Sequence, residues 1–99
     1  MTLRVDLTPE AEADLAEIHA WYAERGIELA EGFRRALDEA MAAFARHPEM
    51  HPVVHRSVRR ALLRRFPYCV FYVIEAERVV VYGCFHARRD PQSWQLRVQ

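Results

Sequence analysis

The first part of the chain changes from a strand pattern to a helix pattern within a few residues. Leu3–Leu7 reads L-R-V-D-L, a strict apolar–polar alternation that predicts a half-buried strand. Thr8 and Pro9 then suit the cap and the first position of a helix. Gly26 is expected to end this helix in a left-handed conformation. The apolar face of the helix consists of Ala11, Leu15, Ile18, Trp21 and Tyr22.

A second helix is predicted to follow at once and to end at His47-Pro48. Its apolar positions recur every three or four residues, which is typical of an amphipathic helix. They are Ala30, Phe33, Leu37, Ala40, Met41 and Phe44. Because the turn at Gly26 is so short, the two helices should form an antiparallel hairpin, and we interpret their aromatic residues as core.

The second half of the chain has the pattern of a sheet. Pro48 and Pro52 predict a loop over residues 47–57. Runs of β-branched and aromatic residues predict strands over Val58–Phe66, Tyr68–Glu75 and Arg78–Phe85. The last two strands form a hairpin that turns at Ala76-Glu77 or through a four-residue loop.

This order of elements predicts an α+β fold. It comprises an N-terminal strand, an antiparallel two-helix hairpin and a three-stranded antiparallel sheet, which the first strand must also join so that its backbone groups are paired. The strand over residues 68–75 is apolar on both faces. One face carries Cys69, Phe71 and Val73, and the other carries Tyr68, Val70, Tyr72 and Ile74. The hairpin of helices can cover only one face, so the other needs a partner chain or a second layer from the C-terminal tail.

The length and composition predict a single globular domain that spans residues 1–99. Hydrophobic residues make up 52% of the chain and charged residues 28%, which excludes a disordered protein. Apolar runs stay far below the roughly 20 residues that span a bilayer. The first strand begins at Leu3, so we expect no secretory signal and a cytoplasmic protein.

The net charge of zero conceals a strong asymmetry between the two halves. Residues 1–50 hold five arginines against eleven acids, and residues 51–99 hold nine against three. This distribution indicates either a basic face for a nucleic acid or acidic protein partner, or helical acids paired with a basic sheet. All 14 basic residues are Arg, so lysine chemistry is excluded.

Three constellations in the sequence could carry chemistry. Arg59, Arg60, Arg64 and Arg65 could line a phosphate groove, although alternation along a strand puts them on both faces. His47, His51 and His55 have helical spacing for a metal, but the prolines forbid that helix, so neither a metal site nor a cofactor is predicted. Cys69 and Cys84 would face each other if the hairpin turns at Ala76-Glu77, but two buried thiols are favoured over a disulfide.

Several segments together resemble the RelE/ParE toxin superfamily. They are the opening L-T-P-E-A-E-A-D-L-A-E-I, the run V-R-R-A-L-L-R-R-F-P-Y-C-V-F-Y-V-I and the closing V-V-V-Y-G-C-F-H-A-R-R-D-P-Q-S-W. The resemblance extends from Val5 to Trp94, and its most specific parts are Arg65-Phe66-Pro67-Tyr68 with Tyr72, and His86–Pro91. It implies the toxin of a type II toxin–antitoxin pair. Its antitoxin would wrap an extended segment over Phe66, Tyr68 and Tyr72.

The superfamily contains two activities, and the sequence leaves both open. The helical hairpin and the H-A-R-R-D-P tail look more like the ParE branch, the plasmid stabilisation type, which implies inhibition of DNA gyrase without catalysis. On that interpretation the target-binding residues would be Arg59, Arg60, Arg64, Arg65, His86, Arg88, Arg89 and Trp94. The first alternative is a RelE-like, ribosome-dependent mRNA endonuclease that uses Glu49, Arg65 and His86. The second is a non-toxic binding module of the same fold.

Overall fold

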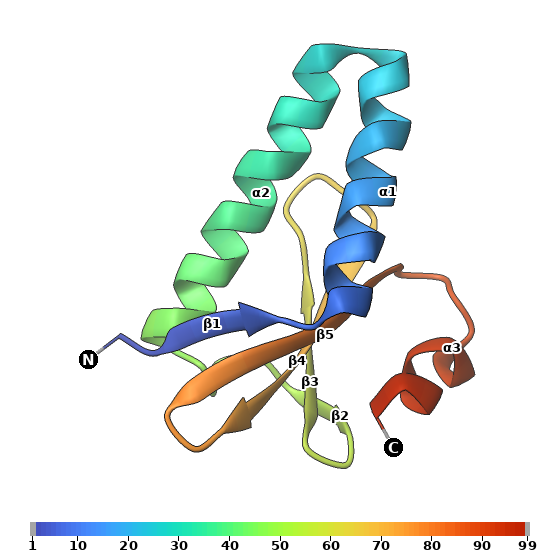
Figure 1. The fold of residues 1–99 in the computed structure, drawn as a ribbon. Coiled ribbons are helices and arrows are strands. Elements are labelled where there is room, and N and C mark those ends of the chain that lie inside the picture. The colour runs from blue at the N-terminus through green and yellow to red at the C-terminus, as the bar shows by residue number, and fades with distance from the viewer. Residues whose placement is uncertain (1, 99) are drawn as a thin grey trace.

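The computed structural model describes residues 2–98 and has a mixed α+β fold (Figure 1). Two long helices, a five-stranded sheet and a short C-terminal helical segment follow one another along the chain. The elements are β1 (Arg4–Leu7), α1 (Pro9–Arg25), α2 (Ile27–Arg46), β2 (Val53–His55), β3 (Val58–Leu62), β4 (Tyr68–Glu75), β5 (Arg78–His86), α3 (Pro91–Gln95) and the 3-10 turn η1 (Leu96–Val98). No helix among the described residues is long and apolar enough to span a membrane.

The predicted helical hairpin is confirmed. The Thr8 hydroxyl accepts a hydrogen bond from the Ala11 N–H at 3.1 Å, and Pro9 occupies the first turn, so α1 begins where the sequence indicates. Gly26 alone separates the two helices. Its φ is 156° and its ψ is 130°, a conformation accessible to glycine but different from the left-handed terminator that we expected.

The sheet differs from the prediction in strand count and in topology. Its strand order is β1-β5-β4-β3-β2. The first strand does join the sheet, but it pairs parallel with β5, because the helical hairpin carries the chain back over the sheet before β5 is reached. The additional strand β2 lies in the segment predicted as a loop. Three residues are too few to show a periodicity, and the prolines at positions 48 and 52 favoured a loop over a strand at Val53-Val54.

The strand β3 is shorter than the predicted Val58–Phe66 because a tight turn begins after Leu62. The Leu63 N–H donates to the Tyr68 carbonyl oxygen at 2.9 Å and closes this turn. Arg65 within it has φ 69°, in the left-handed region, which no strand residue adopts. Residues 63–67, which we call the β3–β4 turn, therefore leave the sheet and rise behind the two helices (Figure 1).

Two apolar clusters lie on the two faces of the sheet, as the alternation along β4 predicts. Val70 and Tyr72 pack under the helices, whereas Cys69 and Phe71 belong to the opposite cluster. The opposite face is covered by α3, where the Trp94 ring stacks on the Phe71 ring at 4.5 Å between centroids. The sequence left open whether a partner chain or the C-terminal tail covers this face, and in the structure the C-terminal tail covers it.

A bulge in β5 corrects the expected cysteine pairing. The hairpin turns at Ala76-Glu77, since Glu75 pairs with Arg78. The register then shifts by one residue between Phe71 and Tyr72 of β4. Cys69 consequently pairs with Phe85, and Cys84 pairs with Val70. Both thiols are buried and free, and they belong to different clusters.

Candidate functional site

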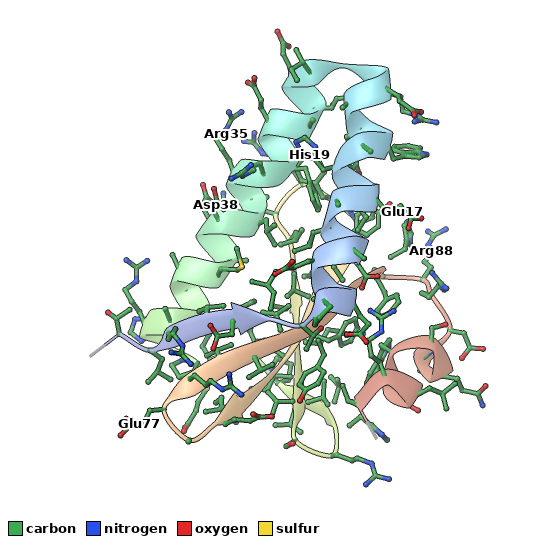
Figure 2. All side chains as sticks on the ribbon, viewed as in Figure 1. Glu17, His19, Arg35, Asp38, Glu77 and Arg88 are labelled. Atoms are coloured by element: carbon green, nitrogen blue, oxygen red, sulfur yellow. The ribbon has the colours of Figure 1, made fainter. Side chains whose placement is uncertain are left out.

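A cleft of about 470 Å³ opens between α2 and the β3–β4 turn. Its floor is apolar and its rim is charged, with arginines from both walls. Gly32, Ala36 and Phe66 form the floor, and Glu28, Arg35, Glu39, Arg64 and Arg65 form the rim. Figure 2 shows the Arg35 side chain leaving α2 on the side away from α1.

Helical spacing builds the first wall of this cleft. The α2 residues that line it lie three or four positions apart, so they share one face of the helix. The Phe66 ring packs over Gly32, where a Cβ would lie in ordinary contact with Phe66 Cζ, at 3.4 Å. The ring also packs edge-on against Tyr22 and Phe33, at centroid distances of 5.2 and 5.6 Å. The floor is thus part of an aromatic cluster anchored in the core.

Backbone hydrogen bonds build the second wall. Leu63 and Tyr68 close the β3–β4 turn, and the Pro67 carbonyl accepts from the Ala87 N–H at 2.8 Å. This fixes the turn to the end of β5. Arg64 and Arg65 are consequently held at the tip of an ordered turn, with both side chains exposed to solvent.

The three arginines of the rim make neither an ion pair nor a side-chain hydrogen bond within residues 2–98. Arg78 and Arg97, by contrast, are bound to carboxylates. The pair Arg97–Asp14 is the one ion pair in this range that joins the helical hairpin to the basic second half. The structure therefore does not support general pairing of helical acids with a basic sheet.

An apolar groove continues from the cleft along α2. The two share Ala36, Glu39 and Arg64. The groove is lined further along by Ala40, Ala43, Met50, His51, Ala61, Leu62 and Leu63. Leu62 is 63% exposed and Met50 is 61% exposed. The charged cleft and the apolar groove thus form one continuous surface along α2.

The other residues that were predicted to contact the target differ from one another in exposure and in hydrogen bonding. Arg59 donates to the carbonyl oxygens of Glu49 and His51, at 3.1 and 2.7 Å, so it holds the loop before β2. Arg60 and Arg88 are exposed. Trp94 is only 7% exposed, because it belongs to the core cluster under α3.

The turn after β5 holds the remaining predicted contacts. His86 Nδ1 accepts from the Arg88 N–H at 3.1 Å, and its ring lies edge-on to Tyr68 at 5.4 Å. The Arg89 guanidinium lies over the Phe85 ring at 5.5 Å. Asp90 caps α3 by accepting from the Gln92 N–H, rather than pairing with Arg88 or Arg89.

The residues expected to bind the antitoxin divide into two groups. Phe66 and Tyr68 are partly exposed beside the helices. Tyr72 is completely buried: its ring stacks on Phe44 at 4.2 Å, and its hydroxyl donates to the Pro48 carbonyl at 2.7 Å. Tyr72 therefore supports the surface from within the core.

The residues of the nuclease alternative lie at different places in the fold. Arg59, whose side chain holds the Glu49 carbonyl, pairs with Tyr72 in the middle of β4, whereas His86 pairs with Tyr68 at the start of β4. Four residues of strand separate these two levels, which is about 13 Å. Arg65 lies in the cleft on the α2 side, while Arg88 of the turn after His86 lies on the outer side of α1 (Figure 2).

The histidines considered for a metal are also dispersed. The His51 ring lies against Phe44, and the His55 ring lies against Trp94. Burial and the nearby Arg59 charge lower the pKa of His51. Among residues 2–98 no group of three potential ligand side chains surrounds a common point.

Sequence reasoning missed the α2 contribution to the cleft. Arg35, Glu28 and Glu39 lie on the polar side of an amphipathic helix, where the pattern does not distinguish solvent from a cleft. Gly32 was the available signal, because a glycine inside a helix needs a packing reason.

Comparisons with known proteins agree with this architecture. The family model described as "ParE toxin of type II toxin-antitoxin system, parDE" matches residues 5–91. A solved chain from "Chromosomal ParDE TA system from P. aeruginosa" superposes with a TM-score of 0.74 at 19% identity. The match covers 86% of this chain and 96% of that chain, and at this identity it shows the shared fold alone. No match was found among curated proteins.

Proposed function

The chain belongs to the ParE toxin family of type II toxin–antitoxin systems, and on this premise we propose that it inhibits growth by binding DNA gyrase. The family makes the chain a toxin with an antitoxin partner. The gyrase target is the inference, together with the absence of a catalytic step. Inhibition of this kind requires only a surface that holds the target in an inactive state.

The separation along the sheet between His86 and Arg59, which holds the Glu49 carbonyl, is the observation that supports binding over RNA cleavage. Cleavage at a ribose 2′-hydroxyl needs a base, a cation for the phosphate charge and an acid for the leaving oxygen, all within reach of one phosphate. Groups anchored four strand residues apart, about 13 Å along the sheet, do not meet that requirement.

The exposed arginines support a protein-binding role. Arg35, Arg64 and Arg65 are without carboxylate partners in the described residues, so they remain available to acidic groups of another protein. A guanidinium holds a carboxylate through two parallel hydrogen bonds and stays charged at any physiological pH. Such contacts favour tight, oriented binding.

The test adds the purified toxin to a gyrase supercoiling assay and, separately, to ribosomes programmed with mRNA. We expect supercoiling to be inhibited while the mRNA remains intact. The variant Glu49→Gln should inhibit supercoiling as the wild type does, because its carboxylate has no part in the proposed surface. Cleaved mRNA that is lost in Glu49→Gln, with supercoiling unaffected, would identify a nuclease instead. If expression without antitoxin leaves growth unchanged, the chain is a non-toxic binding module.

A further inference from the structure

We propose that the cleft between α2 and the β3–β4 turn is the anchor for an acidic segment of the antitoxin. A carboxylate of that segment lies among the guanidinium groups of Arg35, Arg64 and Arg65, and a neighbouring apolar side chain lies over Phe66 and Gly32. The inference rests on the antitoxin partnership of the family and is independent of gyrase as the target.

The charges of the cleft select the ligand. Three guanidinium groups converge from two separate elements onto one opening, and within residues 2–98 they have no carboxylate to bind. The floor beneath them is a phenylalanine ring and a bare stretch of helix. A carboxylate with an apolar neighbour matches both properties. The carboxylate accepts paired hydrogen bonds from a guanidinium, and the apolar group packs on the ring.

The backbone conformation of Arg65 allows binding to be tested separately from folding. Its φ of 69° lies in the left-handed region, which glycine adopts without steric cost and which an arginine adopts only against resistance from its own Cβ. Glycine at position 65 would therefore lower the backbone strain of the folded state. The Arg65 side chain makes no hydrogen bond within residues 2–98, so its replacement by glycine removes the guanidinium without a cost in backbone strain.

The two glutamates of the rim argue for a peptide over a nucleic acid. Glu28 and Glu39 stand on either side of Arg35 along α2. A nucleic acid backbone needs a continuous positive track, because each phosphate must be neutralised in turn. A single carboxylate can sit among the arginines without approaching both glutamates.

The adjoining groove gives the segment a direction. From the arginines at the β3–β4 turn, the apolar path leads along α2 to the exposed side chains of Leu62 and Met50. The segment should therefore be acidic where it meets the turn and apolar where it approaches residue 50. Bound in this way it covers Arg64 and Arg65, so the antitoxin masks arginines that the toxin would otherwise offer to its target.

The first experiment titrates the antitoxin encoded beside the toxin gene into purified full-length toxin. Because a hydrogen bond to a charged group contributes about 1.5–3 kcal/mol, Arg35→Ala and Arg64→Ala should each weaken the Kd by about tenfold or more. Arg34→Ala is the matched control, because Arg34 is an exposed arginine of the same helix that lies on another face, beside Leu37 and Met41. Its Kd should equal that of the wild type.

The second experiment separates binding from folding. Arg65→Gly should keep or raise the melting temperature while weakening antitoxin binding by about tenfold or more. Arg56→Gly is its control, since Arg56 has φ 54° in the turn before β3 and lies outside the cleft. This variant should gain the same stability and keep full affinity. A lower melting temperature for Arg65→Gly, together with unchanged binding, would assign Arg65 to folding and overturn the proposal.

The last measurements test the nature of the ligand. Glu39→Gln should preserve or tighten antitoxin binding, because it removes a negative charge beside an acidic segment. If Glu39→Gln weakens the complex, or if all three arginine variants bind like the wild type, the cleft is not an acidic-segment site. A labelled DNA duplex that binds the free toxin and loses affinity in the same three variants would assign the cleft to nucleic acid. None of these results depends on gyrase inhibition, which is measured separately.

Discussion

The carboxylate of Asp14 on α1 accepts a hydrogen bond from the guanidinium of Arg97, which lies 83 residues further along the chain. The same Asp14 oxygen also accepts the Cys84 N–H at 3.0 Å. The Arg97 guanidinium reaches it by crossing β5 at Gly83 and lies 4.6 Å from the centroid of the Phe85 ring. This one contact fastens the C-terminal segment, the sheet and the helical hairpin together.

The close crossing predicts that Gly83→Ala destabilises the protein. A Cβ at this position would lie 2.8 Å from Arg97 Nη1 and 2.9 Å from Phe85 Cε2. Overpacking of this kind costs about 1–3 kcal/mol, so the unfolding free energy should fall by that amount. In a Trp21→Phe background, the remaining Trp94 fluorescence should also shift towards that of an exposed indole, because the tail loosens. Urea unfolding monitored by fluorescence measures both effects.

The control for this prediction is Gly32→Ala. Its Cβ would meet Phe66 Cζ at 3.4 Å, which is ordinary contact. Alanine is favoured over glycine inside a helix by up to about 1 kcal/mol, so this variant should be as stable as the wild type or more stable. Equal losses in the two variants would contradict the assigned role of the crossing at Gly83.

The partly buried imidazole of His51 predicts a loss of stability in mild acid. Burial, with a smaller contribution from Arg59, holds its pKa below the ordinary value of 6.5. The unfolded chain therefore takes up this proton first, so the His51 contribution weakens as pH falls through 6.5 and stops changing below the folded pKa. The variant His51→Phe keeps a ring against Phe44 and Tyr72 but does not titrate.

Urea unfolding at pH values of about 7.5 and about 5 tests this prediction. The wild type should lose more stability than His51→Phe between these conditions. The difference between the two proteins isolates His51, since the other histidines are common to both. Parallel losses would show that His51 protonates as easily in the folded protein as in the unfolded chain.

The two cysteines are expected to remain reduced and unreactive in the folded protein. Burial and the charge of Asp14 raise the pKa of Cys84 to about 12, and burial also raises the pKa of Cys69. Because the thiolate is the reactive form, alkylation near pH 8 should be slow in buffer and fast in urea. Thiol titration in urea should count two free thiols per chain, with or without prior reductant. A number of free thiols that rises after reduction would indicate a disulfide between the two cysteines.

Local patterns carried most of the fold prediction. The alternation over Leu3–Leu7, the Thr8 cap and the period of the two helices each depend on neighbours within one turn or one strand. The opposite faces of β4 followed in the same way, since side chains alternate along any strand. The need for a cover on the second face could likewise be inferred before the structure identified its occupant.

The site was less predictable because its residues come from distant segments. The sequence singled out Arg64, Arg65 and Phe66, but assigned them to two different partners. Only the structure brings them to one cleft together with Arg35. A polar residue on an exposed helix face has the same local pattern whether it faces solvent or a neighbouring turn.

The sequence by itself determined the helical hairpin, the strand faces and the family resemblance, because each is encoded by residue types at fixed short spacings. The tertiary structure alone decided the parallel pairing of β1 with β5, the bulge that separates Cys69 from Cys84, and the closure of the second face by Trp94. It also decided which arginines share a cleft. These features depend on how segments far apart in the chain compete for the same partners, and that competition is resolved only when the whole chain packs.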